Sequence, residues 1–428
     1  MKASESNKEV TAKFILRALH HKNYRLFFGG QSISLIGTWM QQIAMSWLVY
    51  RLTGSALLLG VVSFSSQIPV FLLASIAGVY VDRWNRHRML IATQTLSMIQ
   101  ALTLAFLTLY GTIHVWQIIA LSIFIGVINA FDMPTRQSFI VQIVDKAEDL
   151  GNAIALNSFM FNGARLVGPA IAGILIALLG EGICFLINGL SFVGIIAALL
   201  AIKVPKRKKA VHTSRLWHDL KEGYSYAFGF APMRYILLQL GLMSFMGMAY
   251  AVLMPIFAKD ILHGGPHTLG FLMAASGIGA LTGAVYLASQ RTIIGLGQFI
   301  AYASAIFGMG IIAFSLSKIL IVSLFMMFVT GFGMIVQMAS SNTILQSIVE
   351  DDKRGRVMSI YATAIIGMAP IGNLFAGALA SRIGAPNTLI VSGIACIIGS
   401  LIFAVNLPQI RQEVRPIYIK MGIISELE

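Results

Sequence analysis

The chain has 428 residues, of which 57% are hydrophobic and only 11% are charged, and its mean hydropathy is +0.80. Soluble domains carry roughly 25% charged residues, so this composition excludes a soluble globular protein. The net charge of +14 could suggest a nucleic-acid partner. The basic residues instead gather beside apolar segments, as in membrane proteins, and we expect no nucleic-acid partner.

Long apolar segments follow one another along the whole chain. A membrane-spanning helix needs about 20 apolar residues, and twelve segments reach this length. They lack the alternating pattern of about ten residues that marks barrel strands, so we expect helices. The segments are 24–50, 55–81, 89–110, 115–140, 151–179, 183–203, 234–258, 268–289, 293–315, 319–346, 356–382 and 387–407. The sequence predicts an all-α integral membrane protein with 12 transmembrane helices in two six-helix bundles.

One long polar stretch, residues 204–233, separates the first six segments from the last six. We expect an N-terminal bundle with a cytoplasmic arm (1–203), a basic linker (204–233) and a C-terminal bundle with a cytoplasmic tail (234–428). The halves also repeat, because LVGPAIAGIL (166–175) aligns with PIGNLFAGAL (370–379) at the same place in each half. Chance similarity of small-residue helices is the alternative. Parallel repeats are a transporter architecture with the binding site between the halves.

The distribution of basic residues sets the expected orientation. With both termini in the cytoplasm, we place 26 of the 31 Lys and Arg on that side, as the positive-inside rule requires. The run KVPKRKK (203–209) is expected to rest on anionic lipid headgroups. The first 22 residues show no cleavable signal. We therefore expect a multi-pass protein of the cell inner membrane.

Residues suited to catalysis or metal binding are sparse. Cys184 and Cys396 both lie in apolar segments, where a lone cysteine usually serves packing. The histidines are scattered, and no Ser/His/Asp, Walker or HExxH constellation is present. We expect no enzyme activity, no metal and no cofactor.

A loop after the second apolar segment, GVYVDRWNRHR (78–88), resembles the signature loop between helices 2 and 3 of the major facilitator superfamily. Asn85 stands where that motif usually has its second glycine, and Asn adopts left-handed turns readily. The resemblance implies that Asp82 docks on the N-terminus of helix 11 near Gly355, latching the cytoplasmic side. The alternative is a solvated loop whose basic residues only set topology. The gate candidates in this loop are Gly78, Asp82, Arg83 and Arg86.

Further segments are similar to one branch of that superfamily. AFDMPTRQSF, GNAIALNS, RLVGPAIAG and EDDKRGRVMSIY resemble the siderophore and drug exporters typified by the enterobactin exporter. GARLVGPAIAG (163–173) is similar to the Gly-Pro motif in helix 5 of the superfamily's antiporters. The resemblance implies a monomeric exporter of an amphipathic small molecule by proton antiport. The alternatives are a lysophospholipid or other lipid transporter, and a non-transporting membrane sensor or assembly protein.

Weakly polar, methionine-rich stripes mark four of the expected helices. They follow from a rotation of 100° per residue along helices 1, 4, 7 and 10, which in the superfamily fold surround the central cavity. Flexible methionines suit varied apolar shapes, so the stripes favour an amphipathic or aromatic substrate. Simple filling of gaps between helices is the alternative. The substrate-binding candidates are Gln31, Thr38, Gln42, Asn129, Arg165, Gln239, Tyr250, Gln337 and Ser341.

A charged pair near the end of the fourth segment is the last candidate site. Asp132 and Arg136 are one helical turn apart, with Pro134 between them. Burial raises the pKa of a carboxylate and a nearby Arg lowers it, which makes such a group switchable. Asp132 is thus either the proton carrier and part of the gate, or half of a static ion pair. Arg165, near the membrane middle, is a candidate for an anionic substrate group or a second partner of Asp132.

Overall fold

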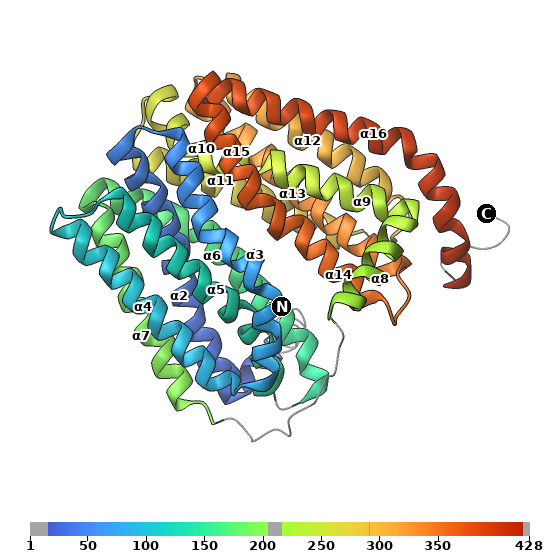
Figure 1. Ribbon diagram of the computed structural model, residues 1–428, viewed down its shortest axis with the longest axis horizontal. Coiled ribbons are helices and arrows are strands. Elements are labelled where there is room, and N and C mark those ends of the chain that lie inside the picture. Colours follow the sequence, from blue (N-terminus) through green and yellow to red (C-terminus); the bar gives the residue numbers. More distant parts are fainter. Residues whose placement is uncertain (1–15, 145, 204–215, 291, 423–428) are drawn as a thin grey trace, which may run out of the picture. The chain divides into compact units, whose positions relative to one another are not determined.

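The computed structural model describes residues 16–144, 146–203, 216–290 and 292–422, and all regular elements in these ranges are helical (Figure 1). In chain order they are η1 (Arg17–His20), α2 (Lys22–Thr53), α3 (Ala56–Arg83), α4 (Arg86–Leu109), α5 (Val115–Ile143), η2 (Ala147–Asp149), α6 (Leu150–Leu179), α7 (Glu181–Ala201), α8 (Leu216–Gly229), α9 (Ala231–Leu242), η3 (Met243–Gly247), α10 (Ala249–Ile256), η4 (Phe257–Ile261), α11 (Pro266–Ala288), α12 (Leu296–Leu316), α13 (Leu320–Ile348), α14 (Arg354–Ala362), η5 (Thr363–Gly367), α15 (Met368–Ile383) and α16 (Ala385–Lys420). The all-α prediction is confirmed.

Eleven helices of the described chain are long and apolar enough to cross a membrane. The run from α9 to η4 counts as one of them (Ala231–Ile261); the π-helical turn η3 interrupts it and the π-helical turn η4 ends it. Helix α2 covers the first expected span with 32 residues but is less apolar, since it includes Gln31, Gln41 and Gln42. The expected count of 12 is therefore approximately supported.

The helices form two compact units. Unit 1 comprises the described residues of Met1–Val49 and Ile68–Val211, and unit 2 those of Tyr50–Gln67 and His212–Glu428. The end of α2 and the first part of α3 thus pack with the later half of the chain. The division into a bundle, a linker and a second bundle stays a prediction.

In unit 1, α4 packs between α5 and α7. A chain of buried amides crosses this packing: Asn188 donates to Gln41 at 2.8 Å, and Gln41 donates to Gln100 at 2.9 Å. Buried polar groups need such partners because hydrocarbon offers none. The amide chain fixes how α2, α4 and α7 face one another.

In unit 2, α13 packs against both α11 and α12, and α16 lies along α12 (Figure 1). Glycines let α11 and α13 approach closely. A Cβ at Gly279 would lie 1.9 Å from the carbonyl oxygen of Phe328, and one at Gly331 would lie 1.9 Å from that of Ser276. Only glycine fits at these two positions, as is common where membrane helices pack tightly.

The sequence repeat corresponds to a repeated contact. Gly168 of α6 lies against α2, where an added Cβ would be 3.0 Å from the Ile36 carbonyl oxygen. Its counterpart Gly372 of α15 lies against η3, where a Cβ would be 1.9 Å from the Phe245 carbonyl oxygen. Both halves therefore use the same aligned glycine to pack their fifth span against their first.

Parts of the expected linker and of the expected C-terminal tail are helical. Helix α16 continues beyond the expected end at residue 407 to Lys420, through Pro408 and Pro416. Its last turns bury Ile410 and Val414 in the core of unit 2. Helix α8 forms part of the expected linker, and the rest of that linker, including 204–209 of the basic run, lies outside the described residues.

Candidate functional site

Asp132 lies at the centre of a buried polar cluster in unit 1. Its side chain is 5% exposed, and its Oδ2 pairs with Arg136 at 3.0 Å, as the one-turn spacing predicted. Its Oδ1 lies 2.8 Å from both the Thr93 hydroxyl and the Gln94 amide nitrogen of α4. Helix α5 passes through Pro134 as one continuous helix. Both carboxylate oxygens of Asp132 are thus held by donors from two helices.

The Thr93 hydroxyl has a second acceptor within reach. Its Oγ1 also lies 3.0 Å from the backbone oxygen of Leu90. A hydroxyl carries one proton and two acceptor lone pairs. Thr93 can therefore donate a hydrogen bond to an ionised Asp132, or donate to the Leu90 oxygen while its own oxygen accepts a hydrogen bond from a neutral Asp132. The cluster offers hydrogen bonds to the carboxyl group in both protonation states.

Residues 78–88 comprise the end of α3, the two connecting residues Trp84 and Asn85, and the start of α4, without a left-handed turn. Asn85 is extended (φ −73°, ψ 107°), and its side chain accepts a hydrogen bond from the Arg88 backbone nitrogen as the N-cap of α4. Asn85 thus fills this motif position as a helix cap and does not use a left-handed conformation. Imidazole contacts hold the loop in unit 1: His87 bonds the Leu199 carbonyl at 2.6 Å and stacks on Phe139.

The gate candidates in this loop differ in environment. Arg83 is exposed, while the Arg86 Nε donates to the Val81 carbonyl at 3.4 Å and so covers the end of α3. An added Cβ at Gly78 would meet nothing within 4 Å. The side chain of Asp82 lies outside the described part of the chain, so its latch remains a prediction.

The substrate-binding candidates of unit 1 differ in how exposed their side chains are. Gln31 is buried, Asn129 is half-buried, and Thr38 and Gln42 are exposed. The guanidinium of Arg165 is half-buried and lies 5.9 Å from the ring centre of Trp39. This distance fits a cation–π contact. The partners of Asp132 that the structure shows are Thr93, Gln94 and Arg136 rather than Arg165.

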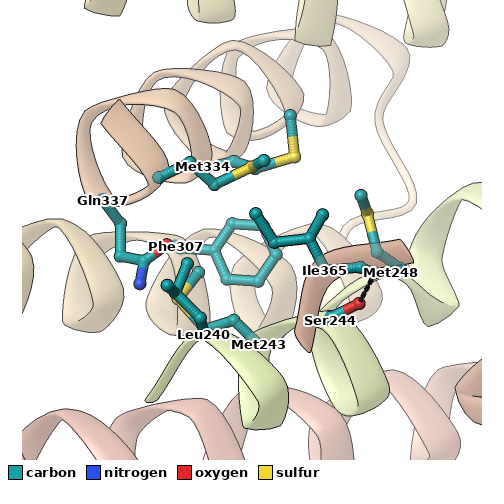
Figure 2. Close-up of a pocket in the computed structure, with 9 residues that line it drawn as sticks. Leu240, Met243, Ser244, Met248, Phe307, Met334, Gln337 and Ile365 are labelled. Atoms are coloured by element: carbon teal, nitrogen blue, oxygen red, sulfur yellow. Dashed lines mark hydrogen bonds between the residues drawn. The ribbon is translucent and has the colours of Figure 1, made fainter. Parts of the chain in front are cut away.

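The four candidates of unit 2 are all buried: Gln239, Tyr250, Gln337 and Ser341. The Gln337 amide nitrogen lies 3.4 Å from the Ser341 hydroxyl, and the Tyr250 hydroxyl lies 3.3 Å from that of Ser276. Gln337 also lines a pocket together with methionines (Figure 2). The structure thus brings Gln337 and Ser341 together on one face of α13.

Several polar residues of these clusters were not among the sequence candidates. Thr93 and Gln94 hold Asp132, and the amide chain through Gln41 stabilises the surrounding helices. Each is a polar residue inside an apolar segment, a pattern that in membranes normally marks contact with protein or water. That signal is present in the sequence, but it does not reveal which residues meet.

The N-terminal turn is fastened to the connection between α5 and α6. Arg17 and His21 both pair with Asp149, at 3.1 and 2.9 Å, and the Tyr24 hydroxyl donates to the Ala153 carbonyl. The His21 hydrogen bond, together with the Arg17 charge, holds the pKa of Asp149 below its ordinary value. Because this pKa is lowered, the contact contributes stability at pH values above the ordinary pKa of about 3.9. The contribution is lost as the pH falls through the lowered pKa.

Replacing Asp149 with Asn should loosen this N-terminal turn. The Asp149→Asn variant loses both ionic contacts, so brief trypsin treatment of the purified protein should cut after Arg17 several-fold faster. Glu148→Gln is the matched control, because that side chain is 74% exposed and the substitution keeps the backbone oxygen to which Arg17 donates. Equal cleavage of Asp149→Asn and wild type would show that Asp149 does not fasten the turn.

Known proteins resemble this chain over nearly its full length. The sequence pattern of a family described as transmembrane secretion effectors matches residues 15–418. The staphyloferrin A transporter of Staphylococcus aureus (strain NCTC 8325 / PS 47) is 27% identical over 383 residues, covering 89% of this chain and 95% of that protein. The multidrug efflux pump Tap of Mycolicibacterium fortuitum is 26% identical, covering 86% and 92%.

This chain belongs to that family, within the major facilitator superfamily. It is a multi-pass membrane transporter of small molecules, with the family and fold of a transporter and not of an enzyme. The crystal structure of a bacterial homologue of the human lysosomal transporter Spinster, inward-facing and unoccupied, has the same fold. Its TM-score is 0.69 at 12% identity, and the match covers 91% of this chain and 98% of that one.

Proposed function

We propose that this transporter exports an amphipathic organic molecule in exchange for protons by alternating access. The observation that carries the proton coupling is the buried cluster of Asp132, Arg136, Thr93 and Gln94. An acidic group inside a membrane helix is costly, and such groups commonly mark proton or substrate paths. The siderophore and multidrug transporters among its relatives support export of a siderophore or hydrophobic compound.

The cluster suits a carrier because its parts come from different helices. Arg136 lies on the same helix as Asp132, whereas Thr93 and Gln94 lie on α4. A movement of α4 relative to α5 would therefore change the donors at Oδ1 of Asp132. Thr93 can bond Asp132 in either state, so proton loss and uptake need no rearrangement of the backbone.

The other parts of the proposal are the location and the substrate path. We place the transporter as a monomer in the cell inner membrane with both termini in the cytoplasm, following the positive-inside rule. Gly78, Asp82, Arg83 and Arg86 would form a cytoplasmic latch, together with Arg136. The substrate would contact the polar stripes, with Arg165 as the site for an anionic group of a siderophore.

Substrate accumulation in cells is the test of export. Cells that lack their own exporters would be loaded with staphyloferrin A, ethidium or a labelled lysophospholipid, with and without this chain. We expect the chain to lower retention of the siderophore or the dye, and an uncoupler that dissipates the proton gradient to restore it. Movement of the lysophospholipid alone would show a lipid transporter, and no effect on any compound would contradict the proposed export.

A further inference from the structure

A small pocket lies inside unit 2, between the π-helical turns η3 and η5 and the helices α12 and α13 (Figure 2). Its volume is about 20 Å³, which is enough for one water molecule. The Phe307 ring of α12 stands near its middle, with Met334 on one side and Leu240 and Met243 on the other (Figure 2).

The lining is almost entirely apolar. Its nine residues include no charged side chain, and four of them are methionines: Met243, Met248, Met334 and Met338. The Ser244 hydroxyl is already engaged, since it donates to the Ile365 carbonyl at 2.5 Å. A carboxylate or other ionised group would find no counter-charge among these residues, and burying it would be costly.

Gln337 is the residue of this pocket whose side chain has a hydrogen-bond acceptor without a partner. Its side chain is fully buried and its nitrogen reaches Ser341, but its Oε1 has no hydrogen-bond partner. A buried acceptor without a partner costs free energy that a donor from a ligand would recover. The neighbouring Ser340 hydroxyl of α13 is also buried without a partner. A ligand donor that entered beside Gln337 would supply the hydrogen bond that its oxygen lacks.

The pocket is lined by π-helical turns and methionines, which can move to enlarge it. π-Helical turns often occur at functional sites, where the helix carries one extra residue. Here η3 and η5 face each other and are joined by the Ser244–Ile365 hydrogen bond. Methionine side chains have three rotatable bonds and adapt to varied shapes. Rotation of Met334 and Met338 would enlarge the space beside Gln337 without moving a charged group.

We infer that this pocket is a binding subsite for an uncharged aromatic group that carries a hydrogen-bond donor, with Gln337 Oε1 as the acceptor. The inference rests on the proposed export function, because the ligand would be part of the exported molecule. According to this inference, unit 2 binds uncharged aromatic compounds rather than carboxylate-rich siderophores.

Binding of N-phenyl-1-naphthylamine tests the inference. This dye is uncharged, has one N–H donor and becomes fluorescent in apolar surroundings. Two close analogues provide the comparison: its N-methyl derivative lacks the donor, and 1-anilinonaphthalene-8-sulfonate adds a negative charge to the same rings. Each would be titrated into the purified protein in lipid nanodiscs, with empty nanodiscs subtracted.

We expect saturable binding of the parent dye, binding of the N-methyl derivative weaker by about three- to tenfold, as for one neutral hydrogen bond, and no saturable binding of the sulfonate. Gln337→Leu should weaken binding of the parent dye to the affinity that the N-methyl derivative shows on wild type. Gln346→Leu, an exposed glutamine on the same helix, should not change it. Because the analogues are compared on wild type, the test does not depend on the variant folding.

Equal binding of the sulfonate or of the N-methyl derivative would overturn the inference, as would the absence of saturable binding of the parent dye. Export of siderophore or ethidium without dye binding would reject the subsite alone. Dye binding without export of any compound would reject the proposed function and leave the subsite.

Discussion

Asp132→Asn should abolish proton-driven export while leaving a folded protein. The amide keeps an oxygen that accepts from Thr93 and Gln94, so the contacts at Oδ1 survive. It cannot ionise, so it can no longer carry a proton. Arg136 loses its ion pair, and because its side chain is 16% exposed we expect a modest loss of stability, about 1–3 kcal/mol.

The measurement separates coupling from folding and from binding. Proteoliposomes would be assayed for export driven by a proton gradient and for exchange of labelled against unlabelled substrate without a gradient. The variant should lose the first by about 100-fold or more, the size of a typical acid–base contribution, and keep the second. Asp351→Asn, an exposed carboxylate of the loop before α14, is the matched control. Unchanged gradient-driven export by Asp132→Asn would show that Asp132 and Arg136 form a static ion pair without a role in proton coupling.

Gly331→Ala should leave most of the protein unfolded or aggregated. The added Cβ would lie 1.9 Å from the Ser276 carbonyl oxygen and 3.0 Å from the Ser276 Cα. These are backbone atoms of α11, so the two helices would have to separate along their contact. Overpacking of this kind costs about 1–3 kcal/mol, and more where no side chain can yield.

Size-exclusion profiles after expression and after heating would measure this effect. We expect a small fraction of monodisperse Gly331→Ala protein and a lower temperature of aggregation. Gly241→Ala is the matched control, because a Cβ there meets nothing within 4 Å and alanine favours the helix of α9. If both variants behave like wild type, then α11 and α13 pack less closely than the structure shows.

The membrane helices could be predicted from sequence because each depends on local composition. About 20 apolar residues suffice to specify a span, and the one-turn spacing of Asp132 and Arg136 was enough to predict their pairing. The extension of α16 was missed because prolines and charges follow residue 407. Ile410 and Val414, one turn apart and both buried, were the signal for it.

Contacts between distant helices could not be predicted in the same way. Thr93 and Gln94 lie almost 40 residues from Asp132, and nothing in their local sequence specifies that they meet it. The unpartnered oxygen of Gln337 is likewise visible only once α13 is packed against its neighbours. Helical periodicity placed Gln337 on a polar stripe, but the packing decides that this stripe is buried inside unit 2.

Proton release from everted membrane vesicles is the most direct test of the account. Vesicles with this chain would be energised to an acid interior, reported by a pH-sensitive dye, before staphyloferrin A, ethidium or a lysophospholipid is added. We predict that the siderophore or ethidium releases protons from wild-type vesicles and that Asp132→Asn vesicles give no response. The absence of proton release with every compound, in vesicles shown to contain folded protein, would contradict proton-coupled export.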